Sequence, residues 1–91
     1  MWTDIIPENT IILDIRSKES FDEWHKTGSL NMPLDEAIKQ ISAETLDKNI
    51  EYIIVCYTGL KTTTLLNVML SHGYKAKGLI GGISTLMAQE K

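Results

Sequence analysis

The sequence alternates between short apolar runs and amphipathic segments, and this alternation limits the possible folds more than any other feature. The clearest run is EYIIVC, residues 51–56, which is apolar throughout 52–55 and rich in β-branched side chains. TIILDI, residues 10–15, is a second run, and YKAKGLIGG, residues 74–82, is a weaker third. Apolar strands that alternate with helices are typical of a parallel sheet covered on both faces. We therefore predict an α/β fold, a three-layer sandwich with a small, mainly parallel sheet.

The segments between and after these runs have the apolar spacing of helices. We expect helices in residues 17–26, 34–41, 62–73 and 83–91, and a further helical turn around residues 45–46. Ser17 can cap the first helix with its hydroxyl group, and Gly73 ends the third as a left-handed cap. The third helix should begin just beyond Lys61. Its apolar residues share one side: Leu65, Leu66, Met69 and Leu70.

Length and composition indicate one small domain over residues 1–91, with 43% hydrophobic and 23% charged residues. The net charge of −3 and the scattered basic residues give no general attraction to nucleic acid or to an anionic membrane. No apolar stretch approaches the ~18 residues of a membrane span, and residues 1–10 do not have the pattern of a secretory signal. One cysteine cannot form an internal disulfide or a multi-cysteine metal site. We expect a cytoplasmic protein without nucleic-acid or membrane partners.

The single cysteine, Cys56, ends the clearest apolar run and is followed by a glycine-bearing loop and a helix. In parallel sheets, ligands bind where strands end and loops lead into helices. Backbone amides at a helix start favour a thiolate, Lys61 adds a positive charge, and Thr58 and Thr62 add hydroxyl donors. Gly59 allows the turn that directs amides inward. A reactive, partly exposed cysteine is one interpretation, and a small core residue is the other.

The loop CYTGLKT resembles the active-site loop of rhodanese-like sulfurtransferases, which is Cys, two residues, Gly, one residue, often Arg, then Ser or Thr. An upstream stretch, LDIRSKESFDEWHKTGSLNMPL, is similar to a second signature of that family. It matches at Asp14, Arg16, Phe21, His25, Gly28, Asn31, Pro33 and Leu34. HGYKAKGLIGGI resembles the last strand of the family with its Gly-Gly turn, here Gly81 and Gly82. The matches run in family order over about residues 11–83.

This resemblance implies a rhodanese-like fold and a thiosulfate sulfurtransferase-like enzyme. The Cys56 thiolate would take the outer sulfur of a small sulfur-containing anion or a persulfide and become a persulfide itself. A thiol, a protein sulfur acceptor or cyanide would then remove that sulfur. Backbone amides of the loop would stabilise the persulfide as an oxyanion hole does. The substrate-binding residues would be Tyr57, Thr58, Gly59, Leu60, Lys61 and Thr62, and neither a metal nor an organic cofactor would be needed.

The same resemblance assigns supporting roles to Asp14, Arg16 and His25. Asp14 and Arg16 could order the active loop or simply pair with each other. His25 is expected to brace the fold rather than act as a base for Cys56. The chain departs from the family at Lys61, where many members carry Arg, so the charge remains but a bidentate fork is lost. Three other departures stand where the family often has Glu, Gly and Trp: Ser20, Trp24 and Leu86.

The N-terminal region looks shortened, because only about ten residues precede the Asp-x-Arg strand and leave little room for the family's first strand and helix. Trp2 is expected to be exposed or to cover a sheet edge. Phe21 and Trp24 are expected in the core, and His72 in solvent beside the end of a helix.

Three alternatives compete with sulfur transfer. A non-catalytic rhodanese-like binding or regulatory module is one, although such modules commonly lose the cysteine that this chain keeps. A cysteine phosphatase or arsenate reductase would need Arg six residues after the cysteine, and Thr62 stands there. A thioredoxin-type protein would need a second cysteine where Gly59 stands.

Overall fold

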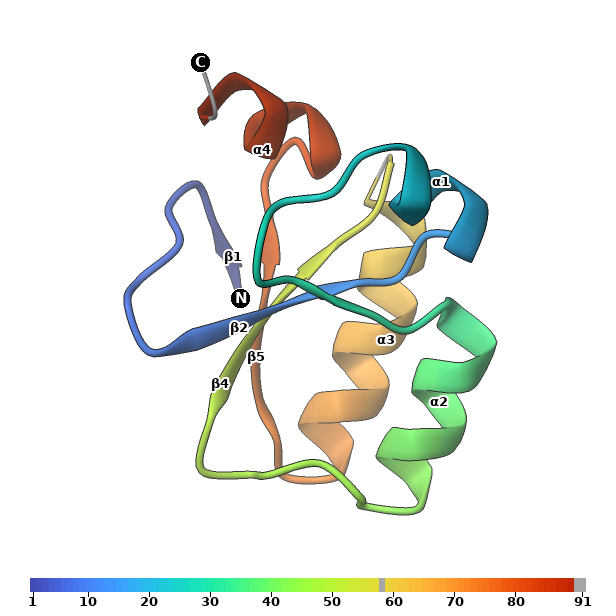
Figure 1. Cartoon of the computed structure of the whole chain (residues 1–91). Helices are drawn as coiled ribbons and strands as arrows, with labels where there is room; N and C mark the ends of the chain where they lie inside the picture. The colour runs from blue at the N-terminus through green and yellow to red at the C-terminus, as the bar shows by residue number, and fades with distance from the viewer. Residues whose placement is uncertain (58, 90–91) are drawn as a thin grey trace.

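The computed structural model describes residues 1–57 and 59–89, and this part of the chain forms a five-stranded sheet in the order β1-β5-β4-β2-β3 (Figure 1). Every strand pairing is parallel. The strands are β1 Trp2–Thr3, β2 Thr10–Asp14, β3 Leu30–Asn31, β4 Glu51–Val55 and β5 Lys75–Leu79. The helices are α1 Lys18–Glu23, α2 Leu34–Ser42, α3 Leu60–Ser71 and α4 Ile83–Gln89.

Two apolar clusters cover opposite faces of the sheet, because side chains alternate along each strand. In β4, Tyr52 and Ile54 belong to the cluster under α2 and α3, whereas Ile53 and Val55 belong to the cluster that α4 covers. Helices α2 and α3 lie side by side on their face of the sheet (Figure 1). The predicted α/β fold with a parallel sheet is therefore confirmed. No helix among the described residues is long and apolar enough to cross a bilayer.

The strands β2 and β4 and the helix α2 lie close to their predicted positions, but α3 differs from the prediction. It begins at Leu60, before Lys61, because Gly59 adopts a left-handed backbone with φ of +89° that turns the chain into the helix early. Leu70 was expected on the buried side and is 37% exposed. Gly73, with φ of +83°, has the left-handed conformation predicted for the cap.

Of the other local features, some differ from the prediction and one, the helix cap at Ser17, agrees with it. The helical turn expected at residues 45–46 is wrong, because Glu44 adopts φ of +55° and the chain leaves the helical conformation there. The strands β1 and β3 were not predicted. Ser17 caps α1 as expected, accepting a hydrogen bond from the Ser20 amide at 3.2 Å. Trp24 is only partly buried, against the cluster that α4 covers, and Phe21 is also only partly buried.

The carboxyl ends of the central strands meet at one edge of the sheet. Asp14 pairs with Val55 in the β2–β4 register, and the Ile15 amide donates to the Val55 carbonyl at 3.0 Å. The Gly81-Gly82 turn after β5 reaches the same edge, where the Ile83 amide donates to the Cys56 carbonyl at 3.0 Å. A side chain at Gly82 would overlap that carbonyl oxygen. The backbone of Cys56 is thus held between β2 and the turn before α4.

We predict that Gly82→Ala destabilises the fold more than Gly28→Ala. Both glycines have positive φ, but a methyl group at Gly28 would meet nothing within 4 Å. Gly28→Ala should therefore lower the free energy of unfolding by the backbone strain alone, about 1–2 kcal/mol. Gly82→Ala adds the overlap with the Cys56 carbonyl and should lose about 1–3 kcal/mol more. Urea unfolding of both variants measures the difference, and equal losses would contradict the close approach.

Candidate functional site around Cys56

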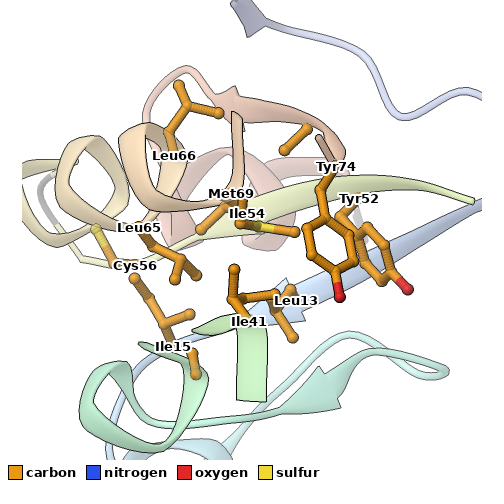
Figure 2. Packing of buried hydrophobic residues seen from close by; sticks show 12 residues of the cluster. Leu13, Ile15, Ile41, Tyr52, Ile54, Cys56, Leu65, Leu66, Met69 and Tyr74 are labelled. Carbon is orange, nitrogen blue, oxygen red and sulfur yellow. The ribbon is translucent and has the colours of Figure 1, made fainter. Parts of the chain in front are cut away.

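Cys56 directly follows β4, the central strand of the sheet, as the position of the apolar run predicts. Figure 2 shows its side chain at one end of the core cluster that includes Ile15 and Leu65. The residue is 3% exposed, so the expectation of a partly exposed thiol is wrong. The reason is that β2, α3 and the Gly-Gly turn converge on this end of β4. Burial alone also fits a core cysteine, so the interpretation depends on what contacts the sulfur.

Hydrogen-bond donors contact the sulfur of Cys56 from the loop and from α3. The Gly59 amide donates to Sγ at 3.0 Å, and the Thr62 hydroxyl donates at 3.1 Å. The left-handed turn at Gly59 aims its amide back at the sulfur, and Thr62, which is 1% exposed, lies in the first turn of α3. Such donors favour the thiolate over the thiol. Thr58, the other predicted hydroxyl donor, lies outside the described residues.

A pocket of about 300 Å³ opens beside the sulfur. Its lining residues come from the end of β2, the start of α1, the Cys56 loop and the start of α3: Arg16, Ser17, Cys56, Tyr57, Leu60 and Lys61. The pocket thus contains two basic side chains and two large exposed ones, Tyr57 and Leu60. Cys56, Tyr57, Leu60 and Lys61 were predicted site residues, whereas Ser17 was not predicted to line the pocket.

Asp14 and Arg16 form a buried ion pair on the edge of this pocket. Nη2 of Arg16 donates to Oδ2 of Asp14 at 2.8 Å, and Nε donates to Oδ1 at 3.0 Å. Nη2 also donates to the carbonyl of Trp24 at 2.7 Å. The hydrogen bonds to Asp14 raise the pKa of Arg16, so its charge is permanent. The two residues therefore pair with each other, which is one of the two arrangements expected from the sequence. The pairing fixes the guanidinium at the pocket.

Arg16 also contacts the loop after Cys56, because its guanidinium lies 5.3 Å from the ring centre of Tyr57, and its role in ordering this loop stays a prediction. The Tyr57 hydroxyl donates to Oγ of Ser20 in α1 at 2.9 Å. Ser20, and after it the nearby Arg16, lower the pKa of Tyr57, because both can donate a hydrogen bond to its phenolate form. Ser20 was noted in the sequence only as a departure from a family signature. Its contact with Tyr57 spans 37 residues of sequence and has no local signal.

Lys61 and His25 lie in different surroundings. Lys61 is exposed at the start of α3 and lines the pocket. His25 is exposed, stacks on the ring of Phe21 at 3.7 Å between ring centres, and its Nδ1 lies 2.7 Å from the Phe21 carbonyl. His25 is not among the residues that line the pocket beside Cys56. These contacts are those of a residue that braces α1, although its role stays a prediction.

The sequence also predicts the surroundings of two residues outside the pocket, His72 and Trp2. Nδ1 of His72 lies 3.4 Å from a carboxylate oxygen of Glu44, at the end of α3. Trp2 lies in the edge strand β1 and is 42% exposed, so it both covers the sheet edge and faces solvent. Within residues 1–57 and 59–89 there is no group of three or more His, Cys, Asp or Glu side chains that could hold a metal ion.

Comparison with known proteins shows the family. The model of the rhodanese-like domain matches residues 3–89, so this chain belongs to the rhodanese-like domain family. It is 27% identical over 88 residues to a thiosulfate sulfurtransferase GlpE of Coxiella burnetii, covering 96% of this chain and 80% of the relative. It is 29% identical over 76 residues to a tRNA sulfurtransferase of Pyrobaculum aerophilum, covering 84% of this chain but only 15% of that protein.

A solved structure agrees with the fold. The rhodanese-related protein of Thermoplasma volcanium superimposes with a TM-score of 0.80 at 18% identity, covering 90% of this chain and 80% of the other. At this identity the likeness concerns the fold, and it confirms the rhodanese-like architecture. Both named relatives are sulfurtransferases by name, whereas the family shown for this chain is that of the rhodanese-like domain.

In wild type, we expect the pKa of the Cys56 thiol to lie below the ~8.5 of an unperturbed cysteine. We predict that Thr62→Val raises this pKa. The substitution keeps the shape of the side chain but removes the donor to Sγ. A hydrogen bond to a charged group is worth about 1.5–3 kcal/mol, so the midpoint should rise by about one to two pH units. The rate of alkylation by iodoacetamide against pH measures this midpoint.

Thr64→Val is the matched control, because Thr64 is exposed on the same helix. It should leave the midpoint of Cys56 unchanged. A wild-type midpoint at or above the unperturbed value, or equal midpoints for Thr62→Val and wild type, would show that the loop does not activate the thiol.

Proposed function

We propose that this protein is a sulfurtransferase that carries sulfur as a persulfide on Cys56. The observation that supports this most is the contact of the Gly59 amide and the Thr62 hydroxyl with Sγ of Cys56, beside a pocket that also holds Arg16 and Lys61. A structural core cysteine has no need of donors aimed at its sulfur or of basic side chains beside it. A nucleophile needs both.

In the first step, the Cys56 thiolate attacks the outer sulfur of the donor. With thiosulfate, a new S–S bond forms to Cys56, the S–S bond of thiosulfate breaks, and its electron pair leaves with sulfite. With an organic persulfide, the leaving group is a thiolate, which takes up the proton of the persulfide. The basic side chains of Arg16 and Lys61 would attract the anionic donor and lower the energy of the leaving anion.

In the second step, the persulfide gives its outer sulfur to an acceptor. The outer sulfur is anionic and would face the pocket, where Tyr57, Leu60 and Lys61 would contact it or the incoming acceptor. A thiol, a protein sulfur acceptor or cyanide attacks this sulfur, the bond to Cys56 breaks, and the thiolate of Cys56 is restored. The Gly59 and Thr62 donors then stabilise the leaving thiolate. We also assign Thr58 to this loop on the sequence pattern alone.

Asp14 and His25 would act through other residues. Asp14 fixes the guanidinium of Arg16 through their ion pair. His25 would hold the end of α1 through Phe21. No metal or organic cofactor enters either step. Since the nucleophile is a thiolate that must stay reduced, we propose a cytoplasmic location.

The named relatives suggest the kinds of donor and acceptor. Thiosulfate is the donor in the name of the Coxiella burnetii relative, and a Bacillus subtilis relative, 32% identical over 68 residues, is named a putative sulfur carrier protein. This chain spans only 15% of the Pyrobaculum aerophilum tRNA sulfurtransferase, and we propose sulfur transfer to a thiol or a protein acceptor.

We predict that Cys56→Ser abolishes sulfur transfer from thiosulfate to cyanide. The hydroxyl of serine is a far weaker nucleophile than a thiolate and cannot form a persulfide. Thiocyanate production by wild type and variant measures this, and urea unfolding shows whether the variant keeps its fold. Activity that survives the substitution, or a folded wild type without activity toward thiosulfate or an organic persulfide, would refute the proposed function.

We predict that the charge at position 61 tunes the use of thiosulfate. Lys61→Ala should lower kcat/KM for thiosulfate roughly tenfold to a hundredfold, the effect of about 1–3 kcal/mol from a charge-assisted hydrogen bond. Lys61→Arg should lower KM, because a guanidinium fork holds a sulfur oxyanion better than an ammonium group does. Steady-state kinetics with thiosulfate measures both variants.

Lys75→Ala is the matched control for charge, because Lys75 is exposed at the start of β5. The amino ends of the strands lie there, at the opposite end of the sheet from Cys56. Lys75→Ala should leave kcat/KM unchanged. If kcat/KM is the same in both Lys61 variants and in wild type, Lys61 does not bind the substrate and is a solvated residue at the start of α3.

A further inference from the structure

Trp2 packs against the chain segments that carry the donors to the Cys56 sulfur. The parallel register of β1 and β5 sets Trp2 opposite Gly78. A methyl group at Gly78 would lie 2.6 Å from Cζ3 of Trp2 and 2.8 Å from Cγ2 of Thr62. Real side-chain carbons do not approach this closely, so the indole ring and the Thr62 methyl group together fill the space that Gly78 leaves open.

The same ring reaches the turn at Gly59. A methyl group there would lie 3.6 Å from Cη2 of Trp2, an ordinary van der Waals distance. The Gly59 amide and the Thr62 hydroxyl donate to Sγ of Cys56 at 3.0 and 3.1 Å. The indole therefore packs near both residues that carry these donors, Gly59 and Thr62, although Trp2 is 54 positions away from Cys56 in the sequence.

The conformation of Thr62 links the packing to the sulfur. Threonine carries its methyl and hydroxyl groups on the same carbon, so fixing the direction of one fixes the direction of the other. With the methyl group packed beside the Trp2 ring over Gly78, the hydroxyl group points at Sγ. Without the indole, the space over Gly78 would open and Thr62 could adopt another rotamer.

We propose that Trp2 is a positioning residue, which holds the Gly59 amide and the Thr62 hydroxyl within hydrogen-bond distance of the Cys56 sulfur. Its anchor is β1, which is paired to β5 through the Gly78 amide and the Met1 carbonyl at 2.9 Å and the Ile80 amide and the Thr3 carbonyl at 2.8 Å. The two-residue strand thus sets the reactivity of a cysteine on the central strand. This deepens the proposed function and rests on it for its kinetic consequence.

The test is the rate of alkylation of Cys56 by iodoacetamide against pH, because it needs no sulfur donor. Trp2→Ala should raise the midpoint by about one pH unit, so the rate below both midpoints falls about tenfold. Trp2→Phe keeps a ring over Gly78 and should restore at least half of that loss. Leu46→Ala is the control for stability, because Leu46 precedes β4 at the opposite edge of the sheet and packs against the core. It should lower the urea midpoint and leave the alkylation profile unchanged.

A second variant tests the link through Thr62 without touching Trp2. Thr62→Ser keeps the hydroxyl group but removes the methyl group that packs beside the indole. We expect its alkylation midpoint to rise as well, toward that of Trp2→Ala. If Trp2→Ala and Thr62→Ser both have the alkylation midpoint of wild type, the positioning role is overturned. If one variant is too unstable to measure, an unchanged midpoint in the other is enough to overturn it.

The outcomes separate this inference from the proposed function. If wild type takes no sulfur from any donor but Trp2→Ala still raises the midpoint, the positioning role stands and sulfur transfer fails. If wild type transfers sulfur and the Trp2 and Thr62 variants titrate as wild type does, sulfur transfer stands and the positioning role fails. Where both hold, Trp2→Ala should lower kcat for sulfur transfer at neutral pH with little change in the KM for thiosulfate.

Discussion

The left-handed turn at Gly59 joins the central strand to α3, and the arrangement around Cys56 depends on it. A residue with a side chain would be strained at its φ of +89°, whereas glycine is not. The turn directs the Gly59 amide to the sulfur and starts α3 at Leu60. Because of that start, Thr62 falls in the first helical turn, where its hydroxyl donates to the sulfur. One backbone conformation thus places donors from two elements around one atom.

The two basic side chains around the pocket, Arg16 and Lys61, differ in how firmly their positions are fixed. Arg16 is held by Asp14 and by the Trp24 carbonyl, so it supplies a fixed positive charge and a flat surface for the Tyr57 ring. Lys61 is exposed on a flexible side chain and can follow a ligand. The pocket thus combines a guanidinium group held in one position, that of Arg16, with an ammonium group on an exposed side chain, that of Lys61.

The sequence predicts the elements that bury apolar side chains and misses those that depend on pairing in space. β2 and β4 are visible as apolar, β-branched runs, and the position of Cys56 after β4 follows from them. β1 and β3 have two residues each, too few to show a period. The burial of Cys56, the Tyr57–Ser20 hydrogen bond and the packing of Trp2 on Gly78 join distant segments. No local pattern in one sequence carries such contacts.

The family resemblance located the loop but not its geometry. It indicated that Cys56, Gly59 and Thr62 belong to one site, and the structure adds which atoms of these residues face the sulfur. It also identified Lys61 as a departure, and the structure adds that the exposed Lys61 lines the same pocket as the buried Arg16.

The proposed function requires that Cys56 accepts and then releases a single sulfur atom. Intact-mass spectrometry of the protein after mixing with thiosulfate, followed by peptide mapping, tests it most directly. We expect one added sulfur per chain, located on the peptide that contains Cys56 and removed by cyanide. A wild-type mass that does not change with thiosulfate or with an organic persulfide would contradict it, as would an added sulfur that persists in Cys56→Ser.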